Sequence, residues 1–268
     1  MAYIMTRRHF LPLIAASAAL PSCGDSEPLL FTIGMDMTYP PFEFKNEKGE
    51  PDGVDVKIAE ALARSLGHNN FRLEAYPFEG LIPALQAGKI DLVISAMTAT
   101  DERRKSIDFS DPYAFTAIAM LVQSDSAIQK PDDLKVKQQG LRIVAKIGTT
   151  GESYTREELK EAKLTTFDDE IACVLEVAQK RADVFIYDQL SIYAYWKKNQ
   201  ETTRPVLQPI REESWAIGIK KGKAALLASV NAFLKDFRAG GNLAKLGDQY
   251  LAEEKKALEG MGIPFILR

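Results

Sequence analysis

Residues 95–103 (SAMTATDER) place hydroxyl groups and a guanidinium close together at the predicted start of a helix. Thr100 is a typical N-cap residue, and two acidic residues follow it in the first turn. We therefore expect Arg103 beside the free backbone N–H groups of that helix end. A guanidinium fork, hydroxyls and a helix N-terminus together suit a carboxylate. The alternative is a capped helix whose Arg103 pairs with Asp101 or Asp108 in solvent.

A second candidate segment begins at Asp36 and follows a short apolar strand predicted at 30–34. In open α/β sheets, ligands bind outside the carboxyl ends of the strands. Asp36 and Tyr39 are therefore candidate binding residues, whereas we expect Phe42 and Phe44 to pack in the hydrophobic core.

Three further segments offer polar or aromatic side chains after predicted strands. Phe78 either forms an aromatic wall of a site or packs on the helix that follows it. Thr149 and Thr150 lie in a glycine-rich loop that lacks phosphate-loop spacing, so they either hold a small anion or form an ordinary turn. Asp188 ends a buried strand, where an unpaired carboxylate is costly. It therefore needs a cation, such as a bound ammonium group, or a role as a helix N-cap.

Catalytic and cofactor-binding patterns are scarce in this chain. The two histidines, His9 and His68, lie in the N-terminal leader and in a polar stretch, so neither predicts a catalytic triad. Cys173 is expected to be a small buried apolar residue. No Cys/His spacing suits a metal and no motif suits a nucleotide, so we expect no metal and no cofactor. A formal net charge of −3 without a clustered basic face predicts no nucleic-acid partner.

Residues 1–23 have the pattern of an export signal. Arg7 and Arg8 precede a short apolar run that is too short to span a bilayer. The pair resembles a twin-arginine signal, and an ordinary secretory signal is the alternative. Residues 20–23 (LPSC) resemble a lipobox, which predicts lipid attachment at Cys23 and membrane anchoring without a span. Cleavage nearby would instead leave Cys23 as a free thiol, and Met5 is an alternative start.

Strand and helix patterns alternate along the rest of the chain, which predicts an α/β fold. The rhythm stops after residue 122 and restarts near 141, which indicates two lobes. Asp55 is predicted as the N-cap of the first helix. The expected strands are 30–34, 90–94, 118–122, 141–145, 182–186 and 215–219, and the other expected helices are 80–86, 171–179 and 224–237.

Four ordered segments together resemble the extracytoplasmic solute-binding proteins of polar amino-acid ABC transporters, the bacterial family 3. They are residues 95–113 (SAMTATDERRKSIDFSDPY), 53–59 (GVDVKIA), 148–152 (GTTGE) and 182–188 (ADVFIYD). The resemblance implies a type II periplasmic binding protein fold. Each lobe would be a mixed, mostly parallel sheet flanked by helices, with two crossing hinge strands. The implied parts are 29–117 with 210–268 for lobe one, 123–204 for lobe two, and 118–122 with 205–209 for the hinge.

The same resemblance implies roles around a bound amino acid. Arg103 would pair with the α-carboxylate and Asp188 with the α-ammonium. Further hydrogen bonds to the ligand would come from the Thr98 hydroxyl and from the backbone of Ala96 and Thr150, with Ser95 and Thr149 beside them. Tyr39 and Phe78 would enclose the ligand side chain, and Asp36 and Lys146 would lie at the far end of that side chain.

Lys146 bears on the choice of ligand, since a cation there disfavours lysine or arginine unless Asp36 neutralises it. We therefore expect glutamine or another neutral polar amino acid, with glutamate left open. The resemblance implies a monomer outside the cytoplasm, held near an ABC permease by the lipid. Two alternatives share this fold: a ligand-binding partner of a sensory receptor, and a periplasmic enzyme similar to cyclohexadienyl dehydratase. We expect no enzyme activity, because no pattern places a general acid.

Overall fold

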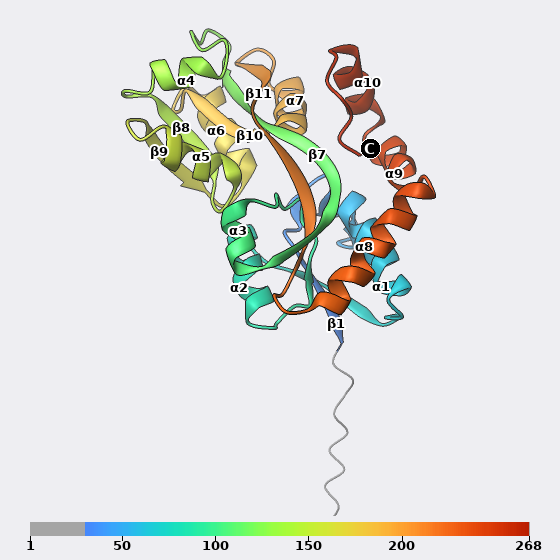
Figure 1. Ribbon diagram of the computed structural model, residues 1–268. Coiled ribbons are helices and arrows are strands. Elements are labelled where there is room, and N and C mark those ends of the chain that lie inside the picture. The colour runs from blue at the N-terminus through green and yellow to red at the C-terminus, as the bar shows by residue number, and fades with distance from the viewer. Residues whose placement is uncertain (1–29, 268) are drawn as a thin grey trace, which may run out of the picture.

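Two long antiparallel strands, β7 (Asp108–Gln123) and β11 (Thr203–Ile219), run through the middle of the molecule and take part in both of its lobes (Figure 1). The computed structural model describes residues 30–267. β7 and β11 pair along almost their whole length, with register shifts, the first of them between Val206 and Arg211. The lobes are therefore joined by a ladder of backbone hydrogen bonds. The exact lobe and hinge boundaries stay a prediction.

One mixed sheet extends through both lobes. Its other strands are β1 (Phe31–Met35), β5 (Phe71–Ala75), β6 (Leu92–Val93), β8 (Arg142–Lys146), β9 (Lys163–Phe167) and β10 (Val184–Asp188). Their order is β5-β1-β6-β11-β7-β10-β8-β9. Pairs toward either end are parallel, and pairs that include β7 or β11 are antiparallel. This confirms the predicted α/β fold with a mixed sheet.

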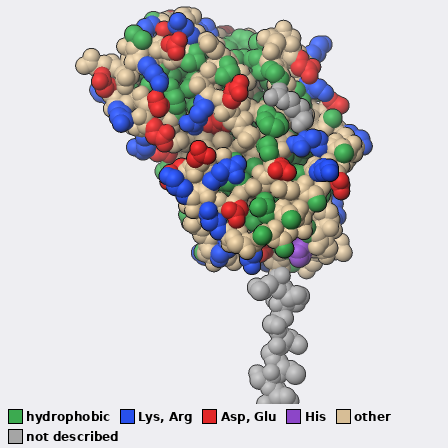
Figure 2. All heavy atoms as spheres, in the orientation of Figure 1, with side chains coloured by type: hydrophobic (Ala, Val, Ile, Leu, Met, Phe, Trp, Pro, Cys, Tyr) green, Lys and Arg blue, Asp and Glu red, His purple; other side chains and the backbone are tan. Residues whose placement is uncertain are grey.

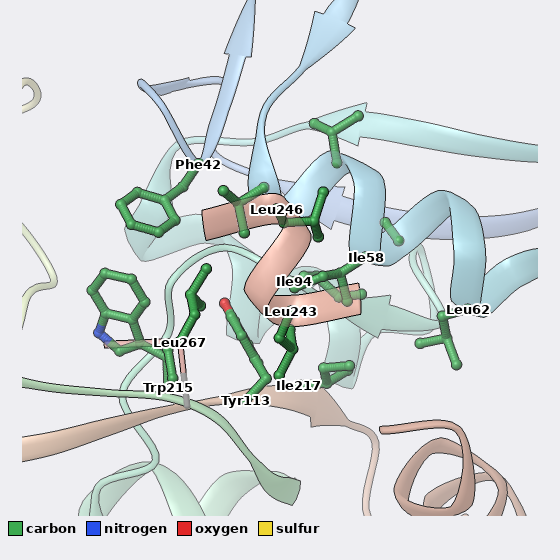
Figure 3. Close-up of a cluster of buried hydrophobic side chains, with 14 of the residues drawn as sticks. Phe42, Ile58, Leu62, Ile94, Tyr113, Trp215, Ile217, Leu243, Leu246 and Leu267 are labelled. Atoms are coloured by element: carbon green, nitrogen blue, oxygen red, sulfur yellow. The ribbon is translucent and has the colours of Figure 1, made fainter. Parts of the chain in front are cut away.

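Lobe one contains β5, β1 and β6 and a core of aliphatic and aromatic side chains (Figure 3). Ile58 and Leu62 are fully buried because they lie on the apolar face of the first helix. Phe42 packs edge-to-face on Trp215 at 5.0 Å between ring centres. The other elements of this lobe are β2 (Thr38–Tyr39), β3 (Glu43–Lys45), β4 (Pro51–Asp52), α1 (Val54–Ser65), η1 (Phe78–Gly80), α2 (Leu81–Gln86), α3 (Asp101–Ser106), α8 (Ala224–Ala239), α9 (Asn242–Tyr250) and α10 (Ala252–Gly260).

Lobe two contains β10, β8 and β9, with buried clusters on both faces of the sheet. Cys173 is completely buried and unpaired, which confirms its predicted place in the core. The helices of this lobe are α4 (Asp132–Val136), α5 (Thr150–Glu158), α6 (Glu170–Ala178) and α7 (Gln189–Lys198).

The described surface mixes both signs of charge. On the face in Figure 2, basic and acidic side chains are interspersed over both lobes. Within residues 30–267, the longest helices lack the length and apolarity that a bilayer crossing requires.

Two sequence predictions about local structure are wrong. The strand predicted at 90–94 is shorter, since β6 covers only Leu92 and Val93, with single backbone hydrogen bonds from Asp91 and Ile94 to β1 on either side. The N-cap of α1 is Gly53 and not Asp55. Gly53 has φ of 120°, and a Cβ there would lie 2.3 Å from the Phe42 carbonyl oxygen, so this position requires glycine.

Candidate functional site

A pocket lies between the lobes and contains about 450 Å³ of space unfilled by atoms, part of it open to solvent. Segments from both lobes and from β11 form its walls. All eleven residues predicted to bind a ligand lie on these walls: Asp36, Tyr39, Phe78, Ser95, Ala96, Thr98, Arg103, Lys146, Thr149, Thr150 and Asp188. The structure therefore brings together residues that are more than 150 positions apart in the sequence.

Arg103 lies in the first turn of α3, where its backbone N–H donates to the Thr100 hydroxyl at 3.2 Å, as predicted for an N-cap. Its guanidinium donates to the carbonyl oxygens of Thr98 and Gly148, each at 2.8 Å, and lies 5.3 Å from the Phe78 ring centre. Gly148 belongs to lobe two, so Arg103 bridges the lobes. Burial lowers the pKa of Arg103 to about 10, so the side chain stays cationic at neutral pH.

Asp188 ends β10 and caps α7, which confirms the capping role left open by the sequence. Its Oδ1 accepts the Ser191 N–H at 2.9 Å, and its Oδ2 accepts the Tyr39 hydroxyl at 2.5 Å. The Tyr39 hydroxyl also lies 2.8 Å from the Ser191 hydroxyl. Burial raises the pKa of Asp188, because the carboxylate loses its hydration. A nearby cation would therefore stabilise the ionised form.

Lys146 also lines the pocket and is almost fully buried. Its ammonium donates to Asp36 at 2.6 Å, Glu170 at 2.9 Å and the Thr38 hydroxyl at 3.1 Å. These bonds use all three donors of a lysine. Burial disfavours its charged form, but the two carboxylates outweigh that effect and raise the pKa of Lys146. Glu170 was missed in the sequence because it looks like an ordinary acid in the first turn of α6.

Two buried acids hold the Ser95–Ala96 segment of the pocket wall. Glu43 accepts the Ser95 hydroxyl at 2.7 Å, and that hydroxyl accepts the Asp36 N–H at 2.9 Å. Asp55 accepts the N–H of Ala96, a residue with φ of 44°, at 2.7 Å. Burial raises the pKa of Glu43 well above its usual value and that of Asp55 to about 6. These acids therefore fix the position of Ser95 and Ala96 in the pocket wall.

Four lining residues were not predicted: Glu43, Tyr187, Glu213 and Trp215. Trp215 is 3% exposed, and its ring centre lies 6.2 Å from that of Tyr39. In the sequence it is part of an apolar strand pattern, which indicated only a core residue. Glu213 accepts the hydroxyls of Thr98 and Thr150, each at 2.8 Å. The sequence offered no signal for Glu213, because it lies in a polar segment with several similar acids.

The pocket therefore carries charged groups of both signs from both lobes, and comparison with known proteins assigns the chain to a family. Residues 31–253 match the model of the bacterial extracellular solute-binding proteins, family 3. The chain belongs to this family. The match covers most of the chain, as the sequence segments had implied.

Relatives and solved structures agree with this family. The chain is 29% identical over 224 residues to the L-cystine-binding protein TcyJ of Escherichia coli strain K12, covering 83% of this chain and 82% of TcyJ. It is 33% identical over 262 residues to the arginine-binding extracellular protein ArtP of Bacillus subtilis strain 168, covering 93% of this chain and all of ArtP. The crystal structure of the ancestral amino acid-binding protein AncCDT-1, a precursor of cyclohexadienyl dehydratase, superposes with a TM-score of 0.73 at 35% identity. The superposition covers 82% of this chain and 95% of AncCDT-1.

Proposed function

We propose that this protein binds an amino acid between its lobes and delivers it to an ABC permease. One observation supports this most directly: a guanidinium from lobe one and a carboxylate from lobe two, Arg103 and Asp188, line the same pocket. An amino acid is a zwitterion that needs both partners. Arg103 and Asp188 come from different lobes, so a ligand that pairs with both favours the closed arrangement of the lobes.

The two charged groups retain capacity for such a ligand. Arg103 has five N–H donors, of which the two bonds to backbone carbonyls engage two. The remaining donors suit a bidentate carboxylate. Asp188 accepts two hydrogen bonds from protein groups, and a carboxylate has about four acceptor positions. Tyr39 and Phe78 would then lie beside the ligand side chain, with Ser95, Ala96, Thr149 and Thr150 around its backbone.

The charges around Lys146 favour a ligand with a neutral polar side chain. The ammonium of Lys146 already occupies the position between Asp36 and Glu170, so a basic side chain would meet a like charge. An acidic side chain would meet Asp36 and Glu170, which outnumber this cation. A side-chain amide avoids both conflicts and can donate to Asp36. We therefore place glutamine and similar amino acids first among the candidate ligands.

The location follows the family, and the anchor stays a proposal. Members of this family are extracellular solute-binding proteins. The predicted export signal 1–23 and the predicted lipid site Cys23 lie outside the described residues. We propose that lipid at Cys23 holds a monomer near its permease. A sensory receptor as partner would use the same binding chemistry, and the identity of the neighbouring genes separates the two roles.

A thermal-shift screen with the twenty amino acids, followed by calorimetry, tests the proposal. A neutral polar amino acid should give the largest rise in Tm, because a ligand that binds only the folded state stabilises it. Micromolar affinity corresponds to about −8 kcal/mol, which two charge-assisted contacts and aromatic packing can supply. The absence of a shift with every amino acid would refute amino-acid binding. Incubation with arogenate or prephenate should give no aromatic product, and its appearance would favour the enzyme.

A further inference from the structure

Glu213 is a buried carboxylate on β11 at the meeting point of three segments. Its side chain is 4% exposed. Oε2 accepts hydroxyl protons from Thr98 of lobe one and Thr150 of lobe two, each at 2.8 Å. The guanidinium of Arg211 donates two hydrogen bonds to Oε1, from Nε at 3.2 Å and from Nη2 at 2.9 Å. One side chain therefore connects both lobes to a hinge strand through protein atoms alone.

These four bonds use the acceptor positions of Glu213. A carboxylate has about four such positions, so this one has little capacity left for a ligand ammonium. Glu213 nevertheless lies close enough to Arg103 for its charge to favour the guanidinium. Glu213 also lies at the boundary between the pocket and a wider, more open groove. Both are lined by Glu213, Thr98 and Thr150.

The hydroxyl protons impose a restriction on ligand binding. A threonine hydroxyl has one proton to donate. While Thr98 and Thr150 donate to Glu213, they cannot donate to the carboxylate of a ligand. The hydroxyl contact that the family resemblance implied for Thr98 thus competes with a bond inside the protein.

We propose that Glu213 is an interlobe latch: it takes the hydroxyls of Thr98 and Thr150 in the closed protein and thereby sets the balance between open and closed lobes. This inference rests on the proposed function only for its effect on affinity. Glu213 acts as a positioning residue, because its bonds hold the two walls of the pocket together. The ligand carboxylate is then left to Arg103 and backbone N–H groups.

Glu213→Gln tests the latch with almost no change in shape. A side-chain amide has a single oxygen. It therefore cannot accept all the hydrogen bonds that the carboxylate accepts from the two hydroxyls and from the Arg211 guanidinium. Without ligand, small-angle scattering should show a larger radius of gyration for this variant than for wild type. Calorimetry should show about tenfold to a hundredfold weaker amino-acid binding, as expected when a charge-assisted bond of the closed state is lost. Glu212→Gln, an exposed neighbour on the same strand, is the matched control and should match wild type in both measurements.

A double-mutant cycle with Thr98→Val separates the latch from direct ligand contact. If the Thr98 hydroxyl serves Glu213, Thr98→Val should weaken binding more in wild type than in Glu213→Gln, where the neutral amide is a weaker acceptor for this hydroxyl. Additive losses would overturn the latch, and so would an unchanged radius of gyration for folded Glu213→Gln, with folding checked by circular dichroism. If wild type binds no amino acid, the proposed function fails, but the scattering comparison still decides whether Glu213 closes the lobes.

Discussion

Replacing Lys146 by glutamine is the sharpest test of how this protein selects its ligand. The substitution keeps the length of the polar side chain roughly constant but removes the cation between Asp36 and Glu170. Two buried carboxylates then face each other without a positive partner. We expect the variant to be less stable by about 3–5 kcal/mol, the usual cost of breaking a buried ion pair by removing one partner.

The same change should shift ligand preference toward basic amino acids. A ligand guanidinium or ammonium can take the position that the Lys146 ammonium leaves. Two bonds to charged acceptors contribute about 3–6 kcal/mol, and the lower value applies because the ligand cation must also leave water. About 3 kcal/mol corresponds to roughly a hundredfold change in the Kd ratio of arginine to glutamine.

Calorimetry with glutamine, glutamate, lysine and arginine measures this ratio for wild type and Lys146→Gln. Lys180→Gln is the control, because it removes an exposed lysine of the same lobe from an ion pair with Asp125. Such surface pairs contribute about 0–1 kcal/mol, so this control should keep wild-type preference and stability. The same ligand order in all three proteins would show that Lys146 does not determine side-chain selection.

Two other predictions use the remaining charged groups. Arg103→Ala should weaken amino-acid binding at least about a hundredfold in calorimetry, because charge-assisted hydrogen bonds to the ligand are lost. Arg104→Ala changes an exposed neighbour on α3 and should leave the affinity unchanged. Wild-type affinity in Arg103→Ala would show that Arg103 is not part of the site. Asp55 has a pKa of about 6 in the folded protein against a usual value of 3.8, so the protonated form of its carboxyl favours folding. This contribution to the free energy of unfolding is fully present below about pH 4 and is lost as the pH rises through 6. Denaturant titrations should show wild-type stability falling by about 3 kcal/mol relative to Asp55→Asn over that range, and a constant difference would contradict the raised pKa.

Local patterns in the sequence singled out several segments that line the pocket, and the family resemblance supplied the roles of most of their residues. Asp36, Lys146 and Asp188 each lie at the end of a strand whose apolar pattern is evident, and strand ends are where α/β sheets bind ligands. Thr100 predicted the helix start that orients Arg103. These positions depend on short-range structure, which local patterns encode.

The partners of those residues could not be predicted, because they depend on long-range packing. Glu170 approaches Lys146 from α6, and Glu213 meets Thr150 from β11, 63 positions away. Acids in a chain with 37 Asp and Glu have no local mark that separates a surface charge from a buried partner. The extent of β7 was underestimated for the same reason, since its polar first half is a strand only because β11 pairs with it.

The two strands that connect the lobes differ in length between their paired residues at the crossing. At the crossing, Val206 and Arg211 of β11 pair with Met120 and Ile118 of β7, so residues 207–210 lie opposite Ala119 alone. A bulge interrupts the ladder and bends its strand locally. At this crossing the extra residues therefore lie on β11, whereas the later register shifts, between Trp215 and Gly218, place the extra residues on β7 within lobe one. Shortening the segment 207–210 of β11 should therefore restrict the opening and closing of the lobes while leaving the proposed ligand-binding residues unchanged.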